Sequence, residues 1–235
     1  MAEQVTTSTV ADGSVLLIHM DDGKANALSS SMIADISAAL AQAEADENVV
    51  SAVLTGREGR FSAGFDLSVM QGGGMADIIN LVADGGDLVR NIYGCGVPVV
   101  AACNGHALAA GALMLLGCDI RVGAEGPFKV GLNEVAIGMT LPDWAHTLAE
   151  QRLSKRHIQR AIANARITEP TAAVDVGYLD RVVPADALLD TAIEEAAALS
   201  ALDAGAYRRT MQGFRKPTLD RMAEQIATDR QAADG

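Results

Sequence analysis

One carboxylate in this sequence lies in apolar surroundings that would suit it to proton transfer. Glu134 belongs to the segment 130–138, where most neighbours are aliphatic and the nearest other charge is Lys129. A carboxyl group that loses contact with water has a raised pKa and can exchange a proton near neutral pH. The same glutamate could equally cap a turn or face solvent, as surface glutamates commonly do. The segment by itself leaves both interpretations open.

Two glycine-containing loops upstream of Glu134 provide a second chemical feature. They read FSAGFDL at residues 61–67 and NGHALAAG at residues 104–111, and each follows a predicted strand and leads towards a helix. Such loops can direct backbone N–H groups at a developing negative charge. Neither matches the phosphate-binding patterns GxxxxGKS/T or GxGxxG. Taken singly, each loop is better explained as an ordinary strand-to-helix connection.

Strands and helices alternate in the part of the chain that carries these residues, which predicts an α/β domain with parallel strands. From His157 onward the pattern is mainly helical, with breaks expected at the prolines 170, 184 and 217. Strands are predicted at 14–20, 49–55, 97–103 and 119–122. One helix is predicted to follow a cap at 29–31, and a second to cover 75–93 with an interruption at the glycines 85 and 86. Further helices are predicted from 109, over 187–202 and over 219–233.

Composition restricts the class of protein. The chain has 235 residues, 49% of them apolar, enough for one substantial core. A net charge of −12 without a Lys/Arg-rich stretch argues against nucleic acid as a partner. Neither a signal peptide nor a membrane-spanning apolar run is recognised, so a cytoplasmic location without membrane attachment is expected. Cys95, Cys103 and Cys118 stand in apolar stretches and are expected to be buried free thiols.

The order and spacing of these segments resemble the crotonase (enoyl-CoA hydratase/isomerase) superfamily, over nearly the whole chain. The resemblance implies a ββα spiral core over residues 1–185 and a C-terminal helical region over 186–235 that helps to form a homotrimer or hexamer. The segments that carry it are FSAGFDL, NGHALAAG leading to CDIRV, VGLNEVAIG, KANALS at 24–29 and AVDVGYLDRVV at 173–183.

The family resemblance also implies roles for individual residues. An acyl-CoA thioester would be the substrate, with no separate cofactor, and the backbone N–H groups of Phe65 and Ala110 would form the oxyanion hole. Ala110 stands where the family usually has glycine, so its methyl group is expected to narrow the approach to the thioester. Residues matching the coenzyme A pocket are Ala25, Ala63, Asp66 and Leu67, and the cations proposed for its phosphates are Lys24, Arg215 and Lys216.

One departure from the family pattern distinguishes the possible reactions. Hydratases of the family use two glutamates, but the first of these positions is Leu113, and Glu134 is the second. Leucine cannot hold a water molecule, whereas a single base can move a proton from C2 to C4 of an enoyl thioester. GLNE followed by an apolar stretch and the tripeptide Pro-Asp-Trp at 142–144 resembles the mitochondrial-type Δ3,Δ2-enoyl-CoA isomerases. That resemblance implies isomerisation of 3-enoyl-CoA to trans-2-enoyl-CoA.

Two other functions stay open from the sequence. An enoyl-CoA hydratase could hold its water with Glu134 and the backbone alone. A non-catalytic acyl-CoA-binding homologue could result if Ala109 and Ala110 crowd the thioester. Among the remaining side chains, Asp143 is expected in a solvated turn and His106 in packing. The other histidines show no metal-binding spacing, so no metal site is expected.

Overall fold

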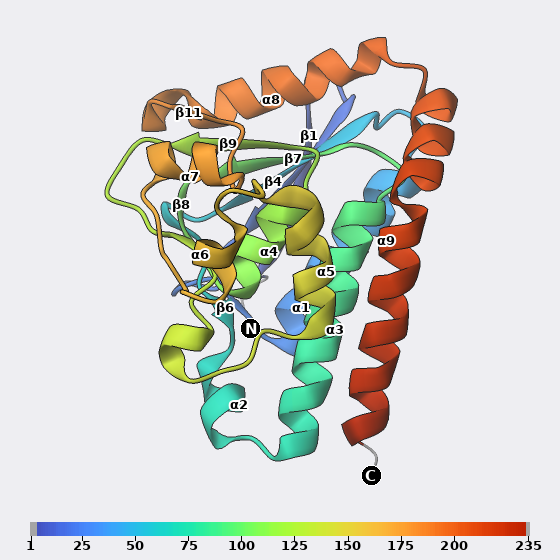
Figure 1. The fold of residues 1–235 in the computed structure, drawn as a ribbon. Coiled ribbons are helices and arrows are strands. Elements are labelled where there is room, and N and C mark those ends of the chain that lie inside the picture. Colours follow the sequence, from blue (N-terminus) through green and yellow to red (C-terminus); the bar gives the residue numbers. More distant parts are fainter. Residues whose placement is uncertain (1–3, 234–235) are drawn as a thin grey trace.

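The computed structural model describes residues 4–233, whose centre is a six-stranded sheet in the order β1-β2-β4-β7-β9-β11 (Figure 1). β1 is antiparallel to β2, and the later pairs are parallel. The predicted α/β class is confirmed, and β1 is an addition to it. The strands are Val5–Val10 (β1), Val15–Met20 (β2), Ser51–Gly56 (β4), Val99–Cys103 (β7), Ile120–Ala124 (β9) and Arg181–Val183 (β11).

Short strands form two smaller sheets, with the orders β10-β8-β5 and β3-β6. β5, β8 and β10 directly follow β4, β7 and β9 along the chain. Successive turns therefore add one strand to the long sheet and one to a short sheet, which is the ββα spiral that the family resemblance implies. The short strands are Ala27–Leu28 (β3), Gly59–Ser62 (β5), Gly64–Phe65 (β6), Gly105–Leu108 (β8) and Val130–Gly131 (β10).

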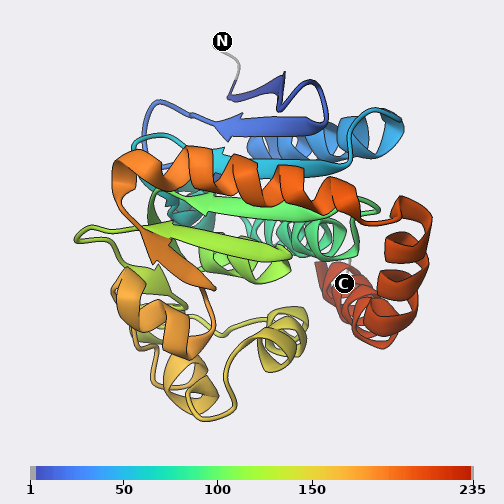
Figure 2. The same ribbon diagram turned by 90° about the horizontal axis from the view of Figure 1, so that it is seen from above.

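Helices cover both faces of the long sheet. On one face α1, α3 and α4 enclose the larger core, and on the other α8 crosses β4, β7 and β9 (Figure 2). The helices are Ser30–Ala45 (α1), Leu67–Gly72 (α2), Met75–Gly94 (α3), Ala110–Gly117 (α4), Asp143–Arg152 (α5), Ile158–Ile162 (α6), Pro170–Val176 (α7), Leu188–Ala198 (α8) and Ala204–Ala233 (α9), with short 3-10 turns at Val135–Ile137 (η1), Ala185–Ala187 (η2) and Leu199–Ala201 (η3).

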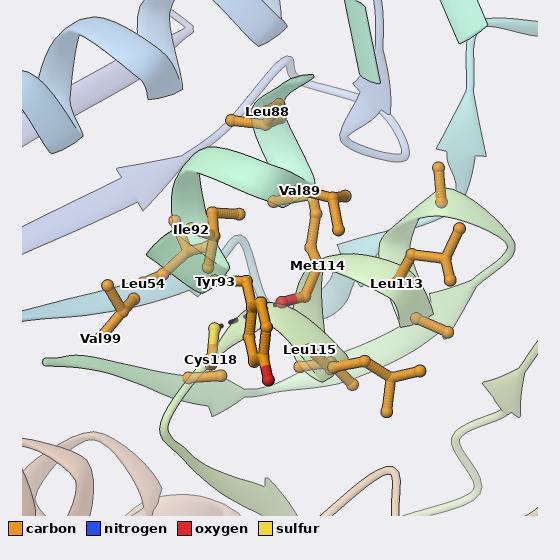
Figure 3. Close-up of a cluster of buried hydrophobic side chains, with 14 of the residues drawn as sticks. Leu54, Leu88, Val89, Ile92, Tyr93, Val99, Leu113, Met114, Leu115 and Cys118 are labelled. Atoms are coloured by element: carbon orange, nitrogen blue, oxygen red, sulfur yellow. Dashed lines mark hydrogen bonds between the residues drawn. The ribbon is translucent and has the colours of Figure 1, made fainter. Parts of the chain in front are cut away.

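Part of the larger core lies where α3 meets α4. Figure 3 shows Val89 of α3 beside Met114 of α4, and Tyr93 of α3 beside Cys118, which follows α4. The Cys118 thiol donates to the Met114 carbonyl oxygen at 3.3 Å. All three cysteines are buried and unpaired, as expected from their apolar segments. No helix within residues 4–233 is long and apolar enough to cross a membrane.

Two predicted helix breaks are wrong. α3 continues through Gly85 and Gly86. Aromatic rings pack where side chains at these glycines would lie, Phe65 against Gly85 and Trp144 against Gly86, and this packing stabilises the helix there. α9 also continues through Pro217. It packs along α3 and α5 (Figure 1), and this contact outweighs the one backbone hydrogen bond that a proline removes.

Candidate active site

The two glycine-containing loops meet in the structure. A Cβ atom on Gly64 would lie 2.9 Å from the Ala109 Cβ and 3.3 Å from the Ala110 backbone nitrogen, so a side chain at residue 64 has no room. Gly64 also has a φ of +91°, a conformation that favours glycine. The close approach brings the backbone of Phe65, the next residue, beside the start of α4. The two predicted oxyanion donors therefore come from adjoining segments.

Ala110 is the first residue of α4, so its N–H has no acceptor within the helix. Within residues 4–233 that N–H makes no hydrogen bond. The residue is fully buried and belongs to the larger core cluster. That its methyl group narrows the approach to the thioester stays a prediction. The unusual backbone belongs instead to Ala109, with φ +50° and ψ −125°. Replacement of glycine therefore introduces strain at Ala109.

Glu134 follows β10 and opens the 3-10 turn η1. β10 pairs with β8, and the Ala109 N–H donates to the Gly131 carbonyl oxygen at 3.0 Å, so the chain reaches Glu134 from directly beside the second loop. The residue is 8% exposed and its side chain makes no capping bond. Burial raises the pKa of the carboxyl group to about 7, opposed by the backbone N–H groups of Glu134 and Asn133. Glu134 is therefore neither a solvated nor a capping residue.

Leu113 lies one helical turn after Ala110 and is 1% exposed. It belongs to the apolar core cluster and carries no hydrogen-bonding group. Ala110 and Glu134 are buried as well, so Leu113 shares its apolar surroundings with both. The exposed apolar residues Val135 and Ile137 belong to the turn that follows Glu134.

The residues predicted to hold coenzyme A gather around the pairing of β3 with β6. The Ala63 N–H donates to the Ala25 carbonyl oxygen at 3.1 Å, and Leu67 is 57% exposed. Asp66 caps α2 by accepting from the Ser68 N–H at 2.8 Å, so its geometry provides a structural role instead of an acid or base. Lys24 is exposed beside this group, and its carbonyl oxygen accepts from Arg57.

Two side chains that the sequence argument overlooked organise the first loop. The buried Asn26 amide donates to the carbonyl oxygens of Met20 and Arg60 at 2.9 and 3.1 Å. The Asp22 carboxylate accepts from the backbone N–H groups of Lys24, Asn26 and Ala27. In the sequence, the one hint of this buried amide is that Asn26 stands between two alanines in the segment KANALS.

Arg215 and Lys216 do not form a phosphate site together. Arg215 is 4% exposed, binds the Asp119 carboxylate at 2.6 Å and lies over the Tyr93 ring. Its charge is thus used to hold α9 against the sheet. Lys216 is exposed and pairs with Asp220 on the same helix. The proposal of Arg215 as a coenzyme A ligand is therefore wrong.

His106 and Asp143 both have surroundings that suit a structural side chain. His106 accepts from the Lys129 N–H through Nδ1 and contacts the Phe128 ring edge-on, which agrees with a packing role. Burial, Arg60 and Lys129 lower its pKa. Asp143 is exposed in the first turn of α5. Within residues 4–233, no group of three or more His, Cys, Asp or Glu side chains is placed to hold a metal ion.

A spiral fold with two adjoining backbone loops and one buried glutamate is the arrangement of a crotonase-type enzyme. The profile of the family described as enoyl-CoA hydratase/isomerase matches residues 11–234. This chain belongs to that family.

Individual relatives agree with this assignment. The chain is 30% identical to human mitochondrial enoyl-CoA delta isomerase 1 over 230 residues, covering 97% of this chain and 76% of that protein. A solved enoyl-CoA hydratase/isomerase family protein from Pseudomonas syringae is 38% identical, with a TM-score of 0.92 and 97% of each chain covered. Solved human mitochondrial delta3-delta2-enoyl-CoA isomerase is 30% identical, with a TM-score of 0.93 and coverage of 98% and 90%. Other matching proteins are described as enoyl-CoA hydratases.

Proposed function

We propose that this protein is a Δ3,Δ2-enoyl-CoA isomerase with Glu134 as its one proton carrier. The observation that supports this most directly is that Glu134 is buried while Leu113 stands where hydratases of the family have their other glutamate. Burial raises the pKa of Glu134 to about 7, so both its protonated and ionised forms are present near neutral pH. The isomerase activity named for the human relatives points in the same direction.

The proposed reaction moves one proton and adds no atoms. The Glu134 carboxylate takes a proton from C2 of the 3-enoyl thioester, and the electron pair of that C–H bond spreads onto the thioester oxygen. The resulting carboxylic acid gives the proton to C4, while the double bond shifts to C2–C3 and the thioester carbonyl re-forms. A base whose pKa lies near the working pH can perform both transfers.

The N–H groups of Phe65 and Ala110 would stabilise the thioester oxygen while it carries negative charge. Loss of one such donor typically costs about 3 kcal/mol of transition-state stabilisation. The coenzyme A part would lie along Lys24, Ala25, Ala63, Asp66 and Leu67, where the exposed Leu67 side chain is free to contact a ligand. Acyl-CoA is then the substrate, and the proposed chemistry needs no further cofactor.

An isomerase assay with a 3-enoyl-CoA tests the proposal. Wild-type protein should form trans-2-enoyl-CoA, and Glu134→Gln should lower kcat by at least about a thousandfold because the proton carrier is gone. Glu150→Gln changes an exposed glutamate on α5 and serves as the matched control. Full turnover by Glu134→Gln would show that another group carries the proton.

Hydration is the second candidate, because enoyl-CoA hydratases are among the matching proteins. It predicts that purified enzyme consumes trans-2-enoyl-CoA in water, with loss of the conjugated thioester absorbance. Binding of acyl-CoA by calorimetry without either reaction would favour the non-catalytic alternative. The homotrimer or hexamer implied by the family remains a prediction for sedimentation analysis.

A further inference from the structure

Tyr178 carries a buried hydroxyl group that the proposed chemistry does not use. The residue follows α7 and Gly177 and is 0% exposed. Within residues 4–233 its phenol oxygen has no hydrogen-bond partner. Buried polar atoms in folded proteins are nearly always paired, so an unpaired phenol indicates a role beyond packing.

The backbone on both sides of Tyr178 is held in place. The Tyr178 N–H donates to the Ala173 carbonyl oxygen at 2.9 Å, which closes the end of α7. Arg121 donates to the Gly177 carbonyl oxygen at 2.6 Å and pairs with the Asp180 carboxylate. The backbone that carries the ring is therefore fixed, and the ring itself is fully buried.

This fixed ring lies against the segment that carries Glu134. Thr168, just before α7, exchanges two backbone hydrogen bonds with Val130 of β10, at 2.9 and 3.0 Å, and α7 packs on that strand. The phenol is close enough to this segment for the Leu132 N–H to act on its ionisation. Burial raises the pKa of Tyr178, the Leu132 N–H opposes this, and the negative charge of Glu134 adds to it.

Two acceptor atoms of this segment also lack partners. Oδ1 of Asn133 and Oε2 of Glu134 are buried and make no hydrogen bond within residues 4–233. A neutral phenol supplies a donor, whereas an amide oxygen and a carboxylate accept. Glu134 is the one charged group among the described residues that acts on the pKa of Tyr178, and no charged side chain acts on that of Glu134. The unpaired donor and acceptors thus complement each other.

We propose that Tyr178 is a positioning residue for Glu134: its phenol donates its hydrogen to one buried water, which donates in turn to the Glu134 carboxylate. The bond would stabilise the ionised carboxylate and fix the direction in which Glu134 accepts a proton. Its place in catalysis rests on the proposed function, whereas the bond itself does not. The hydroxyl group is specific to tyrosine, so Tyr178→Phe removes the donor and keeps the ring.

Titration of Glu134 in the intact protein tests this directly. Carbon-13 NMR of labelled glutamate carboxyl groups, with Glu134→Gln to assign the resonance, follows its ionisation. Because the phenol stabilises the charged form, Tyr178→Phe should raise the pKa of Glu134 by about one unit. Tyr207→Phe is the matched control, since its phenol donates to Asp119 at 2.8 Å on another part of the molecule. A Glu134 titration unchanged in Tyr178→Phe would overturn the proposal.

Kinetics provides a readout that a purely structural role would not change. In Tyr178→Phe the acid limb of the isomerase pH–rate profile should move upward by the same amount, while the rate at high pH is retained. A uniform loss of rate at all pH values, with an unshifted limb, would contradict positioning. If wild-type protein has no isomerase activity, the proposed function fails, and the NMR titration still decides whether the bond exists. Circular dichroism verifies that the variant folds.

Discussion

The phenyl ring of Phe65 lies directly on the backbone of Gly85, in space that any side chain at residue 85 would occupy. Phe65 belongs to β6 and Gly85 to the middle of α3, so this contact joins the first loop to the longest helix on that face. The Phe65 N–H is one of the two proposed donors to the thioester oxygen. A glycine in a helix therefore leaves the space in which the side chain of that donor residue packs.

Gly85→Ala should displace the Phe65 ring and reduce isomerase kcat by about 10- to 100-fold, as small misplacements of a catalytic group can. Gly213→Ala in α9 is the matched control, because a Cβ there meets no atom within 4 Å. The control should retain activity and gain up to about 1 kcal/mol of stability from helix propensity. Unchanged kcat in Gly85→Ala, measured at saturating substrate, would argue against Phe65 as a donor.

Replacing Ala109 or Ala110 by glycine should change the free energy of unfolding in opposite directions. Ala109→Gly relieves a positive φ and should raise the free energy of unfolding by about 1 kcal/mol, a gain of about 2–4 °C in Tm. Ala110→Gly removes a buried methyl group from a helix and should lower it by about 1 kcal/mol. Thermal unfolding of both variants tests this. Destabilisation by Ala109→Gly would mean that its contact with Gly64 outweighs the strain.

The ionisation of Glu134 should make stability depend on pH. Burial raises its pKa from the ordinary 4.5 to about 7, so between these values unfolding releases a proton and stability falls as pH rises. Removing this group by Glu134→Gln should therefore stabilise the protein more at pH 8 than at pH 5, by about 2 kcal/mol. Urea unfolding at both pH values measures the difference. An equal effect at the two pH values would show that the folded-state pKa is not raised.

Activity should follow the same ionisation in the opposite sense. Wild-type kcat/KM for isomerisation should fall as pH drops below about 7, because a protonated Glu134 cannot accept the C2 proton. This acid limb of the kcat/KM profile should report the pKa of Glu134 in the free enzyme, and it should be absent from any residual rate of Glu134→Gln. A limb near pH 4.5 would indicate a solvated base.

Leu113→Glu should introduce hydration at the expense of stability. A second carboxyl group one turn into α4 could hold water opposite Glu134, so consumption of trans-2-enoyl-CoA should rise relative to isomerisation. Burying a carboxyl group at a position that is 1% exposed should cost about 2–4 kcal/mol. Leu113→Gln has the same shape without the ionisable group and should not gain hydration. A folded Leu113→Glu protein without hydratase activity would show that the residue at position 113 does not decide between isomerisation and hydration.

Arg215 and Lys216 should differ sharply although they are neighbours on α9. Arg215→Met leaves the Asp119 carboxylate without its buried partner and should destabilise the protein by about 3–5 kcal/mol. Lys216→Met breaks an exposed pair and should change stability by less than about 0.5 kcal/mol. Similar Tm values for the two variants would contradict the structural role assigned to Arg215.

Patterns between near neighbours in sequence predicted much of the fold. The strand–helix alternation followed from apolar runs and breakers, and Ser29 caps α1 by accepting from the Met32 N–H at 3.2 Å. The raised pKa expected for Glu134 agrees with its burial, but Val135 and Ile137 beside it in the chain are exposed, so these neighbours do not provide that burial. The strand–helix order and the helix cap depend on local propensity, which a sequence contains directly.

Contacts between distant segments decided the rest. By itself the sequence determined the strand–helix order and the apolar setting of one glutamate. Only the tertiary structure showed that the Phe65 ring packs on Gly85 and that Arg215 forms a buried ion pair with Asp119. It also showed that α9 continues through Pro217. Likewise, Tyr178 lies 44 positions after Glu134 in the chain and meets its segment only because α7 packs on β10. Each outcome depends on which faces pack together, a choice that local patterns do not contain.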